Sequence, residues 1–365
     1  MSCDFGLLAA EGVRALSPYQ PGKPVEELER ELGLDHIVKL ASNENPLRPS
    51  QAVLSACRES LSQICRYPDS NGFGLKNALA NKLSVKAGQL VLGCGSNDVL
   101  DLIARVFLTP GTSAVYSQHA FIVYSISIQA VGARAIVTPA KNWGHDLKAM
   151  AKAIVEDTRV VFIANPNNPT GTSFRLSEFV EFMRKVPENV LVVLDEAYYE
   201  YAADEYHPDG VALLSEYPNL IVTRTFSKAY GLAALRVGYA VAAANVADLI
   251  NRVRAPFNTN SFALSAAEAV LSDQDYLDRS RQLNNDGMVQ LTAGMEKLGL
   301  DYIPSSGNFL TVKFEREAIE IYQELLHKGV IVRPIGIYEM PRHLRISIGL
   351  TEENDKFLTA LKSIL

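Results

Sequence analysis

The chain has few of the residues that mark disulfide frameworks, cysteine-based metal sites and membrane spans. Its 365 residues include four cysteines, no two of which form a CxxC pair, and one tryptophan. The sequence therefore predicts neither a disulfide framework nor a bound metal. It has no run of 18 apolar residues, which argues against a membrane-spanning helix. A net charge of −6 argues against nucleic acid or an anionic membrane as a partner.

The rest of the composition is that of a globular protein with a sizeable core. Hydrophobic residues make up 48% of the chain and charged residues 21%, and its length of 365 residues suffices for two domains. The first residues lack the basic flank and the apolar core of a signal peptide. We therefore expect a cytoplasmic protein.

Short β-branched runs alternate with helix-length segments over roughly residues 45–255. Strands that are separated by helices are joined by parallel crossovers, so helices cover both faces of their sheet. The sequence therefore predicts an α/β fold whose large domain holds a mostly parallel, seven-stranded sheet between helices. The predicted strands are 89–93, 113–117, 135–138, 160–164, 190–195, 220–226 and 237–241, and the predicted helices are 97–107, 121–131, 146–156 and 176–184.

The pattern changes after Pro256, which indicates a second and smaller α/β domain. A long helix is expected at about 274–298, followed by a helix near 316–328 and by strands at 308–314, 330–334 and 344–348. We therefore predict a large domain at 45–255 and a small domain at 256–365 that includes the long helix. The N-terminal segment, 1–44, is expected to pack on the small domain.

The stretch TFSKAYGLAALR places Lys228 beside hydroxyl groups at the end of an apolar run. A buried amine near a second cation has a lowered pKa, so it serves as nucleophile and proton carrier near neutral pH. Arg236 supplies that cation, and its guanidinium suits a phosphate, as do the hydroxyls of Thr225 and Ser227. The pattern favours a lysine that forms a Schiff base with an aldehyde cofactor. A solvated surface lysine is the alternative.

Polar residues also follow other predicted strands, where ligands bind in open α/β sheets. Asp195 ends the apolar run 190–194, and its carboxylate suits a protonated pyridine nitrogen. Tyr198 and Asn168, the latter in the turn NPNNPTG, suit the oxygen of the same ring. A helix-capping aspartate, a core tyrosine and a purely structural turn are the alternatives.

The turn GCGSN, 93–97, lies between a predicted strand and a predicted helix. Its small residues allow backbone amides to approach a phosphate at a helix N-terminus. The turn matches neither the dinucleotide-binding pattern nor the Walker A pattern. Together with Ser227 and Arg236, it predicts one half of a phosphate site.

Taken together, these motifs resemble those of the fold-type-I aminotransferases that depend on pyridoxal 5′-phosphate. NPNNPTG, DEAYYEY and TFSKAYGLAALRVGY occur in the family's order, with GCGSND before them and HLRISIG after them. Within the family, LSPYQPG, LASNENP and RYP are most similar to members that act on histidinol phosphate. The resemblance covers nearly the whole chain.

The resemblance implies a role for each matching residue. Lys228 would be the Schiff-base lysine and Asp195 the partner of the pyridine nitrogen. Phe121 would stack on the ring, where relatives often carry a tyrosine. Tyr67 would reach the site of the partner subunit in a homodimer whose active sites lie at the subunit interface. The phosphate would be held by Ser96, Asn97, Ser227, Arg236 and Thr225, and the ring oxygen by Asn168 and Tyr198.

The resemblance also implies a substrate site. Arg345 matches the arginine that binds a substrate carboxylate throughout the family. Arg333 and Tyr19 are the more selective candidates, because a second guanidinium and a phenol suit a phosphate monoester. Asn43 is a further predicted substrate-binding residue. The predicted reaction is transamination between L-histidinol phosphate and 2-oxoglutarate in histidine biosynthesis.

Other activities share most of these motifs. An aromatic amino-acid aminotransferase is the main alternative, and a phosphothreonine decarboxylase of the same fold is a weaker one. A cofactor-sensing regulator would need a DNA-binding extension and basic charge, which this acidic chain does not provide.

Overall fold

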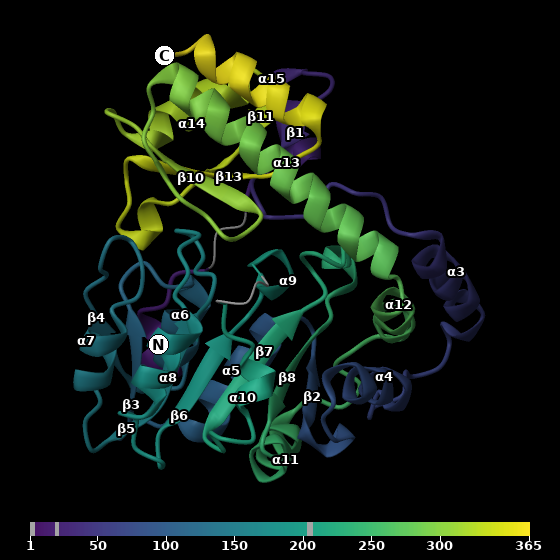
Figure 1. The fold of residues 1–365 in the computed structure, drawn as a ribbon, viewed down its shortest axis with the longest axis vertical. Coiled ribbons are helices and arrows are strands. Elements are labelled where there is room, and N and C mark those ends of the chain that lie inside the picture. Colours follow the sequence, from purple (N-terminus) through teal and green to yellow (C-terminus); the bar gives the residue numbers. More distant parts are fainter. Residues whose placement is uncertain (1–3, 19–21, 203–206) are drawn as a thin grey trace.

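The computed structural model describes residues 4–18, 22–202 and 207–365. A seven-stranded sheet occupies the lower part of Figure 1, and a four-stranded sheet with its helices lies above it. A long helix, α13 (Gln274–Leu298), runs diagonally between the two parts.

The large sheet confirms the predicted fold class. Its order is β2-β8-β7-β6-β5-β3-β4. Strand β8 runs antiparallel to both of its neighbours, and the other neighbouring strands are parallel. All seven predicted strands are present with small shifts at their ends. They are β2 (Leu90–Gly93), β3 (Ser113–Ser117), β4 (Arg134–Thr138), β5 (Thr158–Ala164), β6 (Leu191–Asp195), β7 (Leu220–Thr225) and β8 (Gly238–Ala242).

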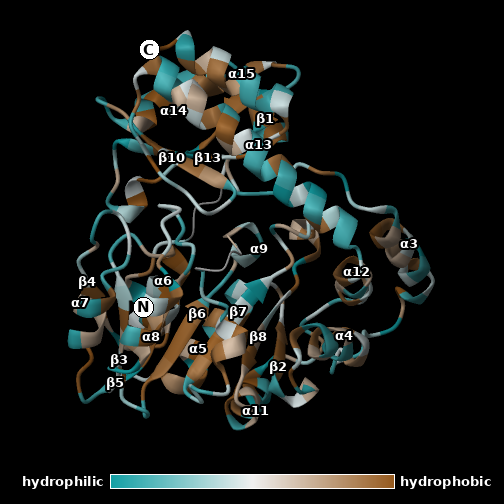
Figure 2. Cartoon of the chain, viewed as in Figure 1, coloured by the Kyte–Doolittle hydropathy of each residue, from teal (hydrophilic) through white to brown (hydrophobic). Residues whose placement is uncertain are grey.

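Alternate residues of the central strands enter two separate hydrophobic cores, as expected of a sheet covered on both faces. In β5, Val161 and Ile163 belong to one core, and Val160 and Phe162 belong to the other. Figure 2 shows these strands as a hydrophobic centre. One face is covered by α5 (Ser96–Phe107), α6 (Ile122–Ala130) and α11 (Ala244–Val253). The other face is covered by α3 (Gln51–Ser60), α4 (Phe73–Leu83), α7 (Leu147–Lys152), α8 (Leu176–Met183), α10 (Gly210–Leu213) and α12 (Ser261–Leu271).

One detail of the sequence prediction was wrong. The helix predicted at 146–156 ends at Lys152, because the chain turns there to enter β5. That turn is closed by two hydrogen bonds, from the Thr158 amide to the Val155 carbonyl and from the Val155 amide to the Thr158 hydroxyl. The step from β7 to β8 is a reversal without a crossover helix, and the loop that makes it carries Lys228.

The upper part is built on a four-stranded antiparallel sheet of order β12-β13-β10-β9. A short parallel pair, β1-β11, joins residues 38–39 to this part. Helix α12 and the first turn of α13 pack in a core of the large sheet. The predicted domain boundary at 255/256 therefore stays a proposal, as does the predicted boundary at 44/45. The elements are α2 (Val25–Leu32), β1 (Val38–Lys39), β9 (Tyr302–Ile303), β10 (Phe309–Lys313), α14 (Ala318–His327), β11 (Val330–Ile331), β12 (Arg333–Pro334), η5 (Gly336–Tyr338), β13 (His343–Ser347) and α15 (Thr351–Lys362).

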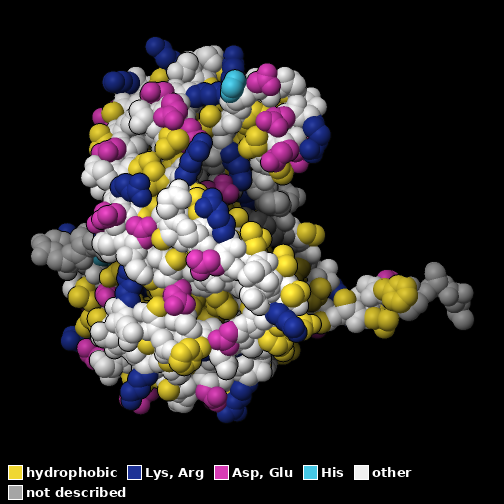
Figure 3. All heavy atoms as spheres, turned by 90° about the vertical axis from the view of Figure 1, so that its right-hand side faces the viewer, with side chains coloured by type: hydrophobic (Ala, Val, Ile, Leu, Met, Phe, Trp, Pro, Cys, Tyr) yellow, Lys and Arg dark blue, Asp and Glu magenta, His cyan; other side chains and the backbone are white. Residues whose placement is uncertain are grey.

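The first described residues, 4–14, form a segment that projects from the body of the molecule, with hydrophobic side chains along it (Figure 3). Phe5, Leu7 and Leu8 are exposed there. Across the described ranges, no helix has both the length and the apolar character needed to cross a membrane. The segment contains η1 (Phe5–Leu8) and α1 (Glu11–Arg14), and the remaining short elements are η2 (Leu61–Gln63), η3 (Ala87–Gln89), α9 (Tyr199–Ala202) and η4 (Ala233–Leu235).

The start of β8 lies so close to the start of α5 that only glycine fits at position 238. A Cβ on Gly238 would meet the Ser96 backbone nitrogen and would lie 2.7 Å from the Gly95 carbonyl carbon. We predict that Gly238→Ala lowers the free energy of unfolding by about 1–3 kcal/mol, because backbone atoms must move. Gly88→Ala is the control, since its Cβ would meet no atom within 4 Å. Urea unfolding of both variants measures the difference, and equal midpoints would contradict the close approach.

Candidate active site

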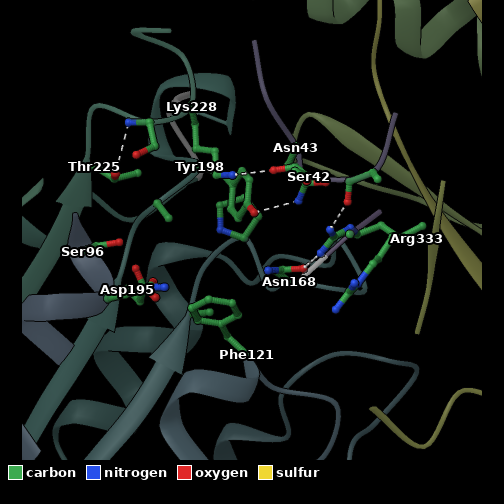
Figure 4. A pocket seen from close by; sticks show the side chains of 18 of the residues that line it. Ser42, Asn43, Ser96, Phe121, Asn168, Asp195, Tyr198, Thr225, Lys228 and Arg333 are labelled. Atoms are coloured by element: carbon green, nitrogen blue, oxygen red, sulfur yellow. Dashed lines mark hydrogen bonds between the residues drawn. The ribbon is translucent and has the colours of Figure 1, made fainter. Parts of the chain in front are cut away.

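A cavity of about 260 Å³ lies between the carboxyl ends of β5, β6 and β7 and the four-stranded sheet above them. This is the edge at which open α/β sheets bind ligands. Figure 4 shows side chains from both parts of the molecule pointing into it. The predicted site residues that line the cavity are Asn43, Ser96, Asn97, Phe121, Asn168, Asp195, Tyr198, Thr225, Ser227, Lys228, Arg236, Arg333 and Arg345.

Lys228 lies in the loop between β7 and β8, with its amine inside the cavity. Its Nζ donates a hydrogen bond to the Ser42 carbonyl at 3.0 Å and lies 5.8 Å from the centre of the Tyr198 ring. Burial lowers the pKa of Lys228 and, together with the positive charges of Arg345 and Arg236, brings it to about 7. The amine is therefore largely uncharged just above neutral pH, as nucleophilic attack on an aldehyde requires.

Asp195 ends β6 at the floor of the cavity and is 3% exposed. Its Oδ2 accepts from the Tyr124 hydroxyl at 2.9 Å, and its Oδ1 accepts from the Thr223 hydroxyl at 3.0 Å. Burial raises the pKa of Asp195, and both donors act against that rise. A carboxylate has about four acceptor positions, so these two donors leave room for a cationic ring nitrogen.

Sequence reasoning missed Tyr124 and Thr223. Each lies one strand repeat or one helical turn away from a predicted site residue. Thr223 is two residues before Thr225 and therefore on the same side of β7, and Tyr124 is one helical turn after Phe121. These periods were the available signal.

Tyr198 and Asn168 both line the cavity (Figure 4). The Tyr198 hydroxyl accepts a hydrogen bond from Asn43 Nδ2 at 2.8 Å, and Asn168 Oδ1 accepts one from Arg345. Burial raises the pKa of Tyr198 to about 12, although Arg345 and Asn43 act in the opposite direction. Tyr198 therefore keeps its proton at neutral pH and can donate it to an acceptor in the cavity.

The far end of the cavity is suited to a phosphate group. Ser96 begins α5, a twelve-residue helix whose N-terminal amides and dipole favour an anion. Gly95 has a φ of +85°, and a Cβ there would lie 2.7 Å from Arg236 Nη2. Arg236 also donates to the Ser227 hydroxyl at 3.4 Å. The helix terminus, the guanidinium and the hydroxyls thus converge on one point.

Two guanidinium groups enter the cavity from the four-stranded sheet. Arg333 on β12 and Arg345 on β13 are paired directly opposite one another in the antiparallel register. Like charges in that position repel one another. Arg345 also donates to the Ala41 carbonyl at 2.7 Å. A bound anion would offset the repulsion, so this side of the cavity is suited to an anion.

Of the predicted site residues that the structure describes, Tyr67 does not line the cavity. Tyr67 is 82% exposed and stacks on Phe257 with a centroid distance of 4.6 Å. Tyr19 lies outside the described residues. The part of the chain that the structure describes has no group of three or more His, Cys, Asp or Glu side chains suited to a metal ion.

The cavity thus presents groups that fit each part of pyridoxal 5′-phosphate. It has an anion site at a helix N-terminus, a buried carboxylate for the ring nitrogen, a phenol and an amide for the ring oxygen, and a largely uncharged amine for the aldehyde. Asn43 was predicted to bind substrate, and the structure places its side chain against Tyr198 and Ser347. Its role toward substrate stays a prediction.

Comparison with known proteins gives a consistent result. The model of the family "Aminotransferase class I and II" matches residues 35–361. "Histidinol-phosphate aminotransferase 2" of Pseudomonas fluorescens is 62% identical over 100% of this chain and 99% of its own length. The crystal structure of histidinol-phosphate aminotransferase from Sinorhizobium meliloti in complex with pyridoxal-5′-phosphate is 29% identical, covers 97% of this chain and 98% of that chain, and has a TM-score of 0.89. A Thermus thermophilus aspartate aminotransferase with maleate, 21% identical with a TM-score of 0.84 over 98% of this chain and 99% of that one, shares the fold. The chain belongs to the aminotransferase class I and II family.

Proposed function

We propose that the protein transfers the amino group of L-histidinol phosphate to 2-oxoglutarate with the help of pyridoxal 5′-phosphate, as a step of histidine biosynthesis in the cytoplasm. The observation that carries the proposal is the pairing of Arg333 with Arg345 at one wall of the cavity. Relatives named histidinol-phosphate aminotransferase are 54–62% identical to this chain and match it over nearly their whole length. This similarity supports the same substrate.

The arginine pair suits a phosphate monoester better than a single carboxylate. A guanidinium binds two oxygens of an anion through parallel N–H groups. Two guanidiniums on adjacent strands offer more donors and more positive charge than one carboxylate uses. In the second half of the reaction, the same pair suits 2-oxoglutarate, which carries two carboxylates.

The remaining residues have roles that follow from their positions. Bound pyridoxal phosphate supplies a ring that withdraws electrons from the substrate carbon. Asp195 would keep the ring nitrogen protonated, and Phe121, just before α6, would offer an aromatic face. Ser96, Asn97, Thr225, Ser227 and Arg236 hold the phosphate. With cofactor and substrate bound, the Lys228 amine would carry a proton from the substrate carbon as general base and then as general acid.

The low pKa of Lys228 leads to a pH-dependent rate of cofactor loading. Because burial lowers the pKa of this amine in the folded protein to about 7, it is already uncharged above that pH, whereas an ordinary lysine is uncharged only above about 10.4. We predict that the rate at which the cofactor-free enzyme gains absorbance with pyridoxal phosphate rises with pH around a midpoint near 7. Stopped-flow absorbance measures it. A midpoint near 10 would contradict a desolvated amine.

The arginine pair predicts a loss that is specific to phosphorylated donors. Arg333→Ala should raise KM for histidinol phosphate by roughly 10- to 100-fold, because it removes charge-assisted hydrogen bonds. KM for phenylalanine should change much less. Arg342→Ala is the matched control, since Arg342 is 55% exposed and pairs with Glu317 at 3.8 Å outside the cavity. Steady-state kinetics with purified protein and a panel of amino donors gives these values.

The same panel separates the alternatives. If phenylalanine has the higher specificity constant in the parent protein, and Arg333→Ala affects both donors equally, the protein is an aromatic amino-acid aminotransferase. Release of carbon dioxide from phosphothreonine would instead indicate the decarboxylase. Either result would reject histidinol phosphate as the substrate.

The proposal includes a homodimer in which Tyr67 enters the cavity of the partner subunit. The segment between α3 and α4 carries large exposed hydrophobic side chains, which monomeric proteins rarely gather on one surface. Figure 3 shows this face of the molecule. The exposed side chains are Leu61, Ile64, Tyr67 and Phe73, with Phe257 against Tyr67. The projecting Phe5, Leu7 and Leu8 add a further apolar surface for a second copy.

Shared active sites predict that two defective subunits complement one another. Lys228→Ala and Tyr67→Ala chains should each have little activity alone. In a mixed dimer, one site combines an intact Lys228 with an intact Tyr67. Half of randomly assorted dimers are mixed, and each has one of two sites intact, so co-expression should restore about a quarter of the parent activity. No recovery would place Tyr67 outside the partner's site.

A further inference from the structure

The Tyr198 hydroxyl is connected to β13 through two hydrogen-bonded side chains. Asn43 Nδ2 donates to Tyr198 Oη at 2.8 Å, and Ser347 Oγ donates to Asn43 Oδ1 at 3.2 Å. The Asn43 backbone amide in turn donates to Ser347 Oγ at 2.7 Å. All three residues are at most 4% exposed, so water does not compete for these positions. Ser347 lies two residues after Arg345 and therefore on the same side of β13.

The chemistry of each group fixes the direction of this chain of bonds. A backbone N–H can only donate, so Ser347 Oγ must accept from Asn43 and has its own proton left to give. The group of Asn43 that takes this proton must be its amide oxygen. The amide nitrogen of Asn43 then faces Tyr198, and an amide nitrogen can only donate. The Tyr198 oxygen accepts that bond and keeps its own proton for a different acceptor.

The alternative orientation of Asn43 would have the opposite effect. If the amide were reversed, its oxygen would face Tyr198 and would take the phenol proton. Tyr198 would then have no proton for a ligand in the cavity. Ser347 favours the first orientation, because only the amide oxygen can accept its proton, and the reversed amide would leave that bond unmade. The backbone around Asn43 is held as well, with a φ of +53° and its carbonyl accepting from Asn308 Nδ2 at 3.0 Å.

We propose that Ser347 is a positioning residue that acts through Asn43 to direct the Tyr198 proton at the ring oxygen of the bound cofactor. The inference rests on the proposed contact between Tyr198 and that oxygen. A donor at the ring oxygen stabilises negative charge there. The proton that the ring oxygen shares with the Lys228 nitrogen is then released at a lower pH. Ser347 therefore affects the pH at which this proton is released by acting through Asn43 and Tyr198, without touching the cofactor.

The test is a pH titration of the visible absorbance of the cofactor-loaded protein, without substrate. Ser347→Ala should raise the titration midpoint by roughly 0.5–1 pH unit, the equivalent of one hydrogen bond. Tyr198→Phe should raise it at least as far. In the Tyr198→Phe background, Ser347→Ala should add no further shift, because there is then no phenol proton for Ser347 and Asn43 to direct. Ser347→Thr keeps the hydroxyl and should restore the parent midpoint.

Ser280→Ala is the matched control for the loss of a buried hydroxyl. Ser280 is 2% exposed and accepts from Asn45 Nδ2 at 2.8 Å, and it does not line the cavity. Its substitution should leave the midpoint unchanged. The absorbance band itself reports that each variant folds and binds the cofactor.

Two results would overturn the role of Ser347. One is an unchanged midpoint in Ser347→Ala while Tyr198→Phe shifts it, and the other is an equal shift from Ser347→Ala with and without Tyr198. An unchanged midpoint in Tyr198→Phe would overturn the contact on which the inference rests. The titration uses no amino donor, so a wrong assignment of histidinol phosphate would leave all these results as they are.

Discussion

The site depends on one amine that is kept out of water and close to positive charge. Lys228 is held by the Ser42 carbonyl, and burial together with Arg345 and Arg236 lowers its pKa to about 7. An amine in that state attacks an aldehyde and later accepts a proton without a separate base. Its position follows from the fold, because the reversal between β7 and β8 places its loop at the carboxyl edge of the parallel strands.

A short strip of chain from the N-terminal region joins the two halves of the site. Ala41 accepts from Arg345, Ser42 accepts from Lys228, and Asn43 donates to Tyr198. Three consecutive residues thus contact the proposed substrate arginine, the reacting lysine and the proposed ring-oxygen tyrosine. The strip continues from β1, which pairs with β11 next to Arg333. A movement of the upper sheet would therefore be transmitted to Lys228 through this strip.

Much of the lining of the cavity was predictable from the sequence, because its residues lie at the ends of recognisable strands. Lys228, Asp195 and Asn168 each follow an apolar run, and parallel strands bring such ends together. The partners Tyr124, Thr223 and Ser347 were not found, since each acts through a contact that only tertiary packing creates. The pairing of Arg333 with Arg345 likewise depends on the register of β12 and β13. Both arginines were predicted in the substrate site, but residue patterns do not determine that register, so their position directly opposite one another and its repulsion were not foreseen. The length of α7 was overestimated, because the turn at Val155 and Thr158 uses a side-chain bond.

The central claim is that Lys228, and no other lysine, holds the cofactor. Its most direct test is borohydride reduction of the protein loaded with pyridoxal phosphate, followed by peptide mass spectrometry. Reduction makes the bond between lysine and cofactor permanent, so the modified peptide identifies the residue. The account predicts a single phosphopyridoxyl group per chain, on the peptide that contains Lys228. A label on another lysine, or a label scattered over exposed lysines with Lys228 unmodified, would contradict it.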